Sequence, residues 1–138
     1  GMRNNYHYDI FSKIENIENA LRKLINSNGL TMTDYENFRD EIHKVRGIKL
    51  STYSKLLYFL NIKFNNNPCL ILNQRLIDVF TSKTYFEFQQ LSGIRYENAE
   101  KNYLNFLNLT NKVADTLKTK GENIEQFLFI FGTNLKDK

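Results

Sequence analysis

Cysteine, proline and tryptophan are nearly absent from this chain of 138 residues, which contains one, one and none of them. Cys69 has no second cysteine to pair with, so an internal disulfide is excluded and a reducing compartment, the cytoplasm, is the expected location. The two histidines, His7 and His43, are not closely spaced with each other or with Cys69. A structural zinc site is therefore not expected.

Long apolar runs and nucleotide-binding motifs are also missing. No stretch of about 18 apolar residues is present, and the N-terminal residues lack the apolar segment of a signal peptide. The sequence has no phosphate loop, no Gly-rich dinucleotide turn, and no His-Glu-x-x-His or Gly-x-Ser-x-Gly motif. We therefore expect no membrane association, no metal and no cofactor. Gly1, which precedes Met2, is typical of an expression-tag remnant.

Apolar material is abundant. Hydrophobic residues make up 41% of the chain and aromatic residues 14%, with eleven Phe and eight Tyr. This composition excludes a disordered chain. A chain of this length buries roughly two thirds of its unfolded surface when it folds, so we expect a single helical domain over residues 1–138.

Positive charge is concentrated in the middle of the chain. The net charge is +4, yet residues 42–77 carry six positive side chains and no Asp or Glu, while the rest carries thirteen positive and fifteen negative groups. Such an excess favours a polyanionic partner, although scattered solvated side chains would give the same count. The six residues are Lys44, Arg46, Lys49, Lys55, Lys63 and Arg75.

Apolar residues recur at helical spacing, and no strand alternation of useful length is present. The pattern predicts an all-α fold, a compact bundle of about six or seven helices. The expected helices cover residues 8–26, 33–46, 51–60, 73–80, 85–91, 96–118 and 122–131. In the last of these, Phe129 and Ile130 add to the apolar face and predict burial on nearly all sides.

Three helix starts are predicted from capping residues. Thr33 and Glu36 have the spacing of a capping box, and Ser51 or Thr52 can cap the next helix. Residues 65–68 have turn composition, and residues 70–72 predict a buried extended stretch that leads to Asn73, which is well placed to cap a further helix.

A tight turn containing Gly47 separates the second and third helices. Two helices joined in this way form a helix-hairpin unit. The hairpin directs backbone amides and a helix N-terminus to one place, which suits an anionic group such as a phosphate, and Arg46 and Lys49 add positive charge. Contact with phosphate is the role we expect for Lys44, Arg46, Gly47, Lys49, Lys63 and Arg75.

Two segments after the hairpin complete a recognisable pattern. Ser54-Lys55-Leu56-Leu57 follows the hairpin, and Leu70-Ile71-Leu72-Asn73-Gln74-Arg75 leads into the next helix. Together they resemble the catalytic stretch of the helix-hairpin-helix DNA glycosylases, especially the 8-oxoguanine DNA glycosylase type and small bacterial proteins of that fold. The C-terminal stretch 124–132 is similar to the same bacterial proteins.

The resemblance implies a site built on two residues. Lys55 stands where the family has a nucleophilic lysine, and Asn73 stands where it has an aspartate. A family member extrudes the damaged nucleotide from the helical stack, and its lysine amine attacks the sugar carbon while the carboxylate stabilises the developing positive charge. The resemblance thus implies a DNA partner and DNA repair.

The chain departs from this pattern at important positions. Asn73 has no negative charge, Arg46 replaces the proline of the family hairpin, and Lys49 replaces its second glycine. We therefore expect a DNA-associated, glycosylase-like helical domain in which base excision is weak, altered or lost. For Lys55 an ordinary solvated lysine, and for Asn73 a purely capping role, stay open.

Other uses of the sequence are also open. Nineteen aromatic residues also fit a helical interaction module that binds a protein partner or a second copy of itself. Cys69, in the apolar segment Pro-Cys-Leu-Ile-Leu, is expected to be a buried structural residue, and His43 is expected on the surface.

Overall fold

The computed structural model describes residues 18–19, 21–24, 29–44 and 47–132. The helix expected over 8–26 lies largely outside these residues, and its described positions 18–19 and 21–24 are helical. Val45 and Arg46, in the expected hairpin, also lie outside them.

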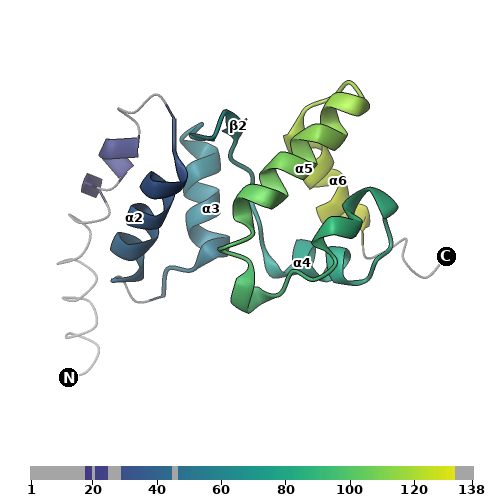
Figure 1. Cartoon of the computed structure of the whole chain (residues 1–138), viewed down its shortest axis with the longest axis horizontal. Helices are drawn as coiled ribbons and strands as arrows, with labels where there is room; N and C mark the ends of the chain where they lie inside the picture. Colours follow the sequence, from purple (N-terminus) through teal and green to yellow (C-terminus); the bar gives the residue numbers. More distant parts are fainter. Residues whose placement is uncertain (1–17, 20, 25–28, 45–46, 133–138) are drawn as a thin grey trace.

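The described part of the chain is mostly helical, which confirms the predicted fold class. Figure 1 shows α2 and α3 side by side at one end of the molecule, with α4, α5 and α6 gathered at the other. The elements are α2 (Met32–His43), α3 (Leu50–Phe59), β1 (Lys63–Phe64), β2 (Asn67–Pro68), α4 (Gln74–Thr81), the 3-10 helices η1 (Phe86–Leu91) and η2 (Tyr96–Asn98), α5 (Tyr103–Thr116) and α6 (Gly121–Phe131).

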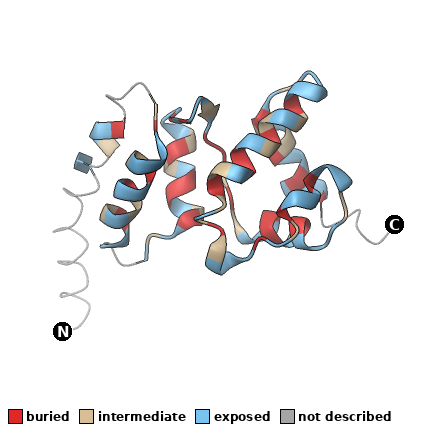
Figure 2. Ribbon diagram, viewed as in Figure 1, coloured by how far each residue is buried: buried red, intermediate tan, exposed pale blue. Residues whose placement is uncertain are grey.

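An aromatic cluster joins the first helices to α5. The Tyr35 ring is stacked on Tyr103 at 5.7 Å between centroids and packs against Phe64 at 4.9 Å. The Tyr35 hydroxyl is 2.9 Å from the Tyr53 hydroxyl, so α2, α3, β1 and α5 meet at one buried point. Buried residues line the facing sides of these helices, and exposed residues cover the outside (Figure 2).

The capping predictions have mixed outcomes. The structure confirms Asn73 as the N-cap of α4, but the prediction for Thr33 is wrong: Thr31 caps α2 and exchanges hydrogen bonds with Asp34. The box forms two residues earlier because Thr31, unlike Thr33, has the extended backbone of a cap. The prediction for α3 is also wrong, since α3 starts after Lys49 without a side-chain cap.

A short hairpin follows α3 at the predicted turn. Asn65 and Asn66 both have positive φ angles, 48° and 68°, which is the geometry of a two-residue turn between antiparallel strands. The apolar pattern predicts no strand here, and the structure adds a pair of two-residue strands. Leu30 pairs in parallel with Phe64, so the hairpin is tied to the segment that precedes α2.

Two predictions for the C-terminal half are corrected. The helix expected over 96–118 is divided into η2 and α5, with turns between them. The prediction of near-complete burial for the last helix is wrong, because Phe129 and Ile130 are 40% and 51% exposed. One face of α6 packs against α5 and α4, while the other faces outward, so apolar residues alone do not locate the core.

The two threonines near the start of α2 offer a direct test of the capping assignment. Both are exposed, and only Thr31 accepts the amide of Asp34, at 3.2 Å. Thr31→Ala should lower the free energy of unfolding by about 1 kcal/mol in urea denaturation. The matched variant Thr33→Ala should cost about half as much or less, and the opposite order would contradict the assignment.

Candidate functional site

A buried hydrogen bond joins the two segments that carry the candidate residues. Ser54 on α3 is fully buried, and its Oγ accepts the backbone amide of Leu72 at 3.1 Å. Lys55 follows Ser54, and Asn73 follows Leu72. The backbones of Lys55 and Asn73 are therefore held near each other across 18 positions of sequence.

Asn73 caps the N-terminus of α4. Its side-chain Oδ1 accepts the amide of Leu76 at 3.1 Å, which confirms the predicted capping role. The remaining amide nitrogen can donate a hydrogen bond but carries no charge. Asn73 is half-buried, so a polar group of a ligand can reach it.

Two further contacts connect these segments to α6. The Tyr58 hydroxyl on α3 donates to Glu122 Oε2 at 2.8 Å. At the start of α4, the Arg75 guanidinium lies 4.9 Å from the centroid of the Phe129 ring and donates to the Ile130 carbonyl at 3.4 Å.

The three contacts close a ring of chain segments that we call the three-sided site. Its sides are residues 54–58 of α3, residues 72–75, and residues 122–130 of α6. At about 1.5 Å of rise per helical residue, the α3 side is roughly 6 Å long and the α6 side roughly 10–12 Å, and the extended side is at most about 10 Å. Lys55, Asn73 and Glu125 each lie on a different side of this ring.

Helix periodicity relates Lys55 to Glu125. Lys55 shares a helix face with Tyr58, three residues later, and Glu125 shares a face with Glu122, three residues earlier. Because Tyr58 and Glu122 are hydrogen-bonded, these two faces look toward each other. Lys55 itself is exposed.

Glu125 is the buried acidic residue of this site. Its side chain is 8% exposed, and it belongs to the inner stripe of α6 that also contains Gly121 and Leu128. Gly121 packs against Asn111 and Leu70, which places this stripe over α5 and the extended segment. Burial, with a smaller contribution from the nearby charge of Glu122, raises the pKa of Glu125 to about 7.

A cavity of about 580 Å³ adjoins the three-sided site. Tyr58 and Glu122, whose hydrogen bond closes the ring, both line it, and Lys63 from β1 and Lys120 from the α5–α6 connection contribute positive charge to its wall. Lys55, Asn73 and Glu125 do not line this cavity, which extends from the Tyr58–Glu122 hydrogen bond toward the β1–β2 hairpin.

The described basic residues predicted to contact DNA are not gathered at the turn before α3. Lys49 precedes α3, whereas Lys63 lies beyond its other end, about 15 Å of helix away. Lys44 pairs with Glu41 at 3.2 Å, and Arg75 lies against α6. Of the predicted set, the structure brings Gly47 and Lys49 together, and it places Arg75 close to Asn73.

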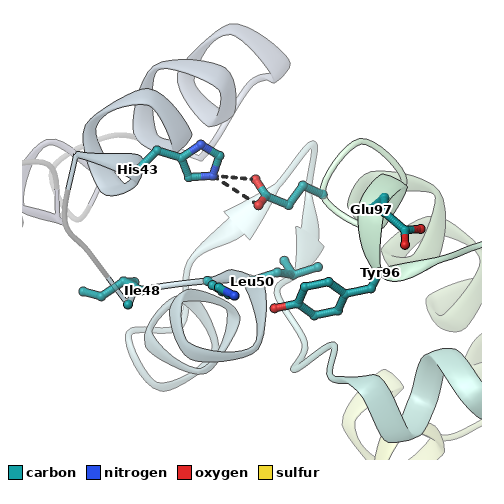
Figure 3. A pocket seen from close by; sticks show the side chains of 8 residues that line it. His43, Ile48, Leu50, Tyr96 and Glu97 are labelled. Carbon is teal, nitrogen blue, oxygen red and sulfur yellow. Dashed lines mark hydrogen bonds and ion pairs between the residues drawn. The ribbon is translucent and has the colours of Figure 1, made fainter.

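Gly47 and Lys49 line a cavity of about 400 Å³ between α2, the start of α3 and η2 (Figure 3). His43 reaches across this cavity and contacts both carboxylate oxygens of Glu100, at 3.1 and 3.0 Å. The Lys49 amine lies 5.9 Å from the centroid of the Tyr96 ring. The wall carries both signs of charge, since Glu97 also lines it.

Hydrogen bonds and ion pairs of Glu100 link α2 to the turn that precedes α5. Arg39 Nε donates to Glu100 Oε2 at 2.7 Å, and the Tyr35 hydroxyl donates to the Glu100 carbonyl at 2.9 Å. His43 is half-exposed, as predicted for a surface residue, but its pairing with Glu100 was not predictable from local spacing.

Cys69 is buried, as predicted, and burial raises the pKa of its thiol to about 12. A protonated, buried thiol is a poor nucleophile. Among the described residues, no group of three or more His, Cys, Asp or Glu side chains is arranged to hold a metal ion. No described helix is long and apolar enough to cross a membrane.

The sequence pattern misses Glu125, Tyr58 and Glu100 as members of these sites. A signal for Glu125 is present in retrospect, since its spacing of four from Gly121 and three from Leu128 fits the inner stripe of the last helix. For Glu100 the sequence has no comparable signal, because its partners lie about 60 positions earlier.

A family model described as "Putative 8-oxoguanine DNA glycosylase OGG-like protein" matches residues 1–129. No curated protein and no solved structure gives a significant match.

The raised pKa of Glu125 predicts how stability depends on pH. The neutral carboxyl favours the folded state, so its contribution is complete below the ordinary pKa of 4.5 and is lost as pH rises through about 7. Glu125→Gln, which is neutral at every pH, should raise the Tm at pH 8 by about 5 °C and have little effect at pH 4. Thermal melts between pH 4 and 8 measure this.

The neighbouring variant Glu122→Gln serves as the control. Glu122 is half-buried, and its pairing with Tyr58 persists in amide form, so most of the fall in Tm between pH 6 and 8 should remain. Equal pH dependence in the wild type and in Glu125→Gln would refute the assignment of this titration to Glu125.

Proposed function

Because the chain belongs to the family of OGG-like 8-oxoguanine DNA glycosylases, we propose that it binds duplex or damaged DNA and that its base-excision activity is weak, altered or lost. The match to the family over residues 1–129 supports a DNA glycosylase-like domain. The proposal concerns the steps beyond this: DNA as the bound partner, and the state of the catalytic site.

One observation carries the proposal more than any other. The Ser54–Leu72 hydrogen bond holds the lysine-bearing helix against the segment that ends in Asn73. A nucleophile and a charge-stabilising group must act on the same sugar carbon, so residues at these two positions must lie close together. Such proximity is required of a glycosylase site.

The character of Asn73 supports reduced or altered chemistry. A carboxylate stabilises a developing positive charge, and a neutral amide does so far less. Its Oδ1 is already engaged with the Leu76 amide. We therefore assign Lys55 the role of candidate nucleophile and Asn73 the role of a polar residue beside it, without the charge that the family's aspartate supplies.

The start of α3 supports contact with the DNA backbone. Lys49 and Gly47 are exposed there, and Gly47 has a φ angle of 89°, which glycine adopts without strain. Because α3 has no side-chain cap, its first amides are available to a phosphate oxygen, next to the Lys49 charge. Arg46, in the same turn, is included in the proposal from its sequence position.

Salt dependence tests DNA binding. Affinity for a fluorescently labelled duplex, measured by anisotropy, should fall linearly on a plot of log affinity against log salt. Lys49→Glu should weaken binding and reduce the magnitude of the slope by about one, because one phosphate contact is lost. Lys112→Glu, on the exposed side of α5, is the matched control and should change the slope less. Absent or salt-insensitive binding would contradict the proposal.

Borohydride trapping on abasic duplex DNA tests the chemistry. The Lys55 amine would condense with the C1′ aldehyde and release water, and borohydride would reduce the resulting imine to a stable amine. We expect slow trapping that Lys55→Ala abolishes. Asn73→Asp retains a good helix cap and adds a carboxylate, so it should speed trapping by roughly tenfold to a hundredfold. Trapping that is unchanged in Lys55→Ala would remove Lys55 from the site.

A specific surface favours a second candidate function, self-association. An apolar groove of about 780 Å³ lies between η1, α5 and α6, and Phe86 and Leu117 on its border are 82% and 63% exposed. Glu87 and Lys112 also line it. In a twofold pair each would face the opposite charge of the second copy. Self-association at micromolar concentration, together with absent DNA binding, would favour this alternative.

A further inference from the structure

Glu125 is a largely buried residue whose carboxylate oxygens keep contact with solvent and have no partner in the part of the chain that the structure describes. It lies on the packed stripe of α6, where an apolar residue would avoid the cost of removing a carboxyl from water. Among the described residues, no hydrogen bond or ion pair partners its carboxylate. A costly group without a structural partner is a candidate for a functional one.

Contacts on both sides of Glu125 along α6 define its surroundings. One turn before it, Glu122 accepts a hydrogen bond from Tyr58 on α3. One turn after it, Phe129 lies against Arg75, two residues beyond Asn73. Glu125 is therefore bracketed by the helix of Lys55 on one side and by the Asn73 segment on the other.

The directions of the two helices bring Glu125 level with Lys55. Along α3, Ser54 contacts the extended segment and Tyr58, one turn later, contacts α6 through its hydrogen bond with Glu122. From Glu122, α6 runs back toward the level of Arg75. Lys55 lies one turn before Tyr58 on α3, and Glu125 lies one turn after Glu122 on α6. The two residues are therefore displaced from the Tyr58–Glu122 hydrogen bond in the same direction.

We propose that Glu125 supplies the negative charge that this site directs at the sugar of an extruded nucleotide, in place of the charge that Asn73 lacks. The inference rests on the proposed function, DNA binding at the three-sided site, and it adds the class of ligand recognised there: a deoxyribose centre that carries positive charge. Glu125 acts electrostatically and forms no bond to the sugar.

The electrostatics of the position suit this role. As the bond between the base and C1′ breaks, its electron pair leaves with the base and positive charge develops on C1′ and the ring oxygen. A carboxylate in a water-poor site stabilises such charge more strongly than one in bulk water. Burial and the charge of Glu122 raise the pKa of Glu125 to about 7, so a cation bound beside the carboxylate would lower this pKa and favour the ionised form.

The experiment compares two abasic-site analogues in the same duplex. A pyrrolidine analogue carries a positive charge at the sugar, and a tetrahydrofuran analogue is neutral and of similar shape. At pH 8, where Glu125 is largely ionised, the wild-type protein should bind the pyrrolidine duplex about tenfold more tightly. Glu125→Gln should bring the ratio of the two affinities close to one while affinity for the tetrahydrofuran duplex is retained.

Glu36→Gln is the matched control, since it removes one carboxylate at an exposed position of α2 outside the three-sided site, and it should keep the preference. Thermal melts of each variant verify that it is folded.

The outcomes separate the two proposals. A wild-type ratio near one, or a ratio that persists in Glu125→Gln, overturns the role of Glu125 while DNA binding stands. Failure of the wild type to bind either duplex overturns the proposed function, and with it this inference. A preference that is lost equally in Glu125→Gln and Glu36→Gln would reflect net charge alone and overturn the role of Glu125.

Discussion

The hydrogen bond between the Ser54 hydroxyl and the Leu72 amide determines how the rest of the site is arranged. Both residues are fully buried, so this bond satisfies a backbone donor that would otherwise be left unpaired in the interior at a cost of about 1–3 kcal/mol. It fixes the extended segment against α3, and this in turn sets where α4 begins. The positions of Lys55 and Asn73 follow from it, because each is the next residue in the chain.

Around this bond, polar contacts add to the aromatic cluster that joins the helices. Glu100 links the turn before α5 to α2 through Arg39 and His43. The Tyr58–Glu122 hydrogen bond joins α3 to α6. The candidate residues lie on α3, on the extended segment and on α6. A site made from three separate elements can hold a ligand on several sides at once.

We propose that the negative charge of the site lies on α6 rather than at the start of α4, where the family pattern has an aspartate. Asn73 retains the capping function that an aspartate also performs, and it gives up the negative charge. A carboxyl is present nearby on α6 instead, at Glu125, in surroundings that disfavour its ionised form. Loss of the charge at one position and its presence at another are consistent with chemistry that is altered.

The sequence predicts local features well and long-range contacts poorly. The helical periodicity, the burial of Cys69 and the capping role of Asn73 all depend on residues close in the chain, and the structure confirms them. The cap of α2 was misplaced from Thr31 to Thr33 because two threonines two residues apart both fit the pattern. Backbone geometry decides which of the two threonines caps α2, and the sequence pattern does not contain it.

The site itself could be predicted only in part. A family pattern predicts Lys55 and Asn73, and their catalytic role stays a prediction. The sequence does not single out Glu125, since neither composition nor spacing shows which carboxylate a neighbouring helix will cover. The basic residues formed a cluster in sequence. The fold separates Lys49 from Lys63 by the length of α3, and the number of charges in a sequence window cannot predict this separation.

The central claim is that DNA occupies the space between α3, the 72–75 segment and α6. Mapping of backbone amide NMR shifts during titration with a duplex that contains a tetrahydrofuran abasic site tests it most directly. The account predicts that the largest shifts fall at residues 47–55, 72–75 and 122–126. Shifts confined to residues 86–90 and 113–117, on the apolar groove, or no shifts at all, would contradict it.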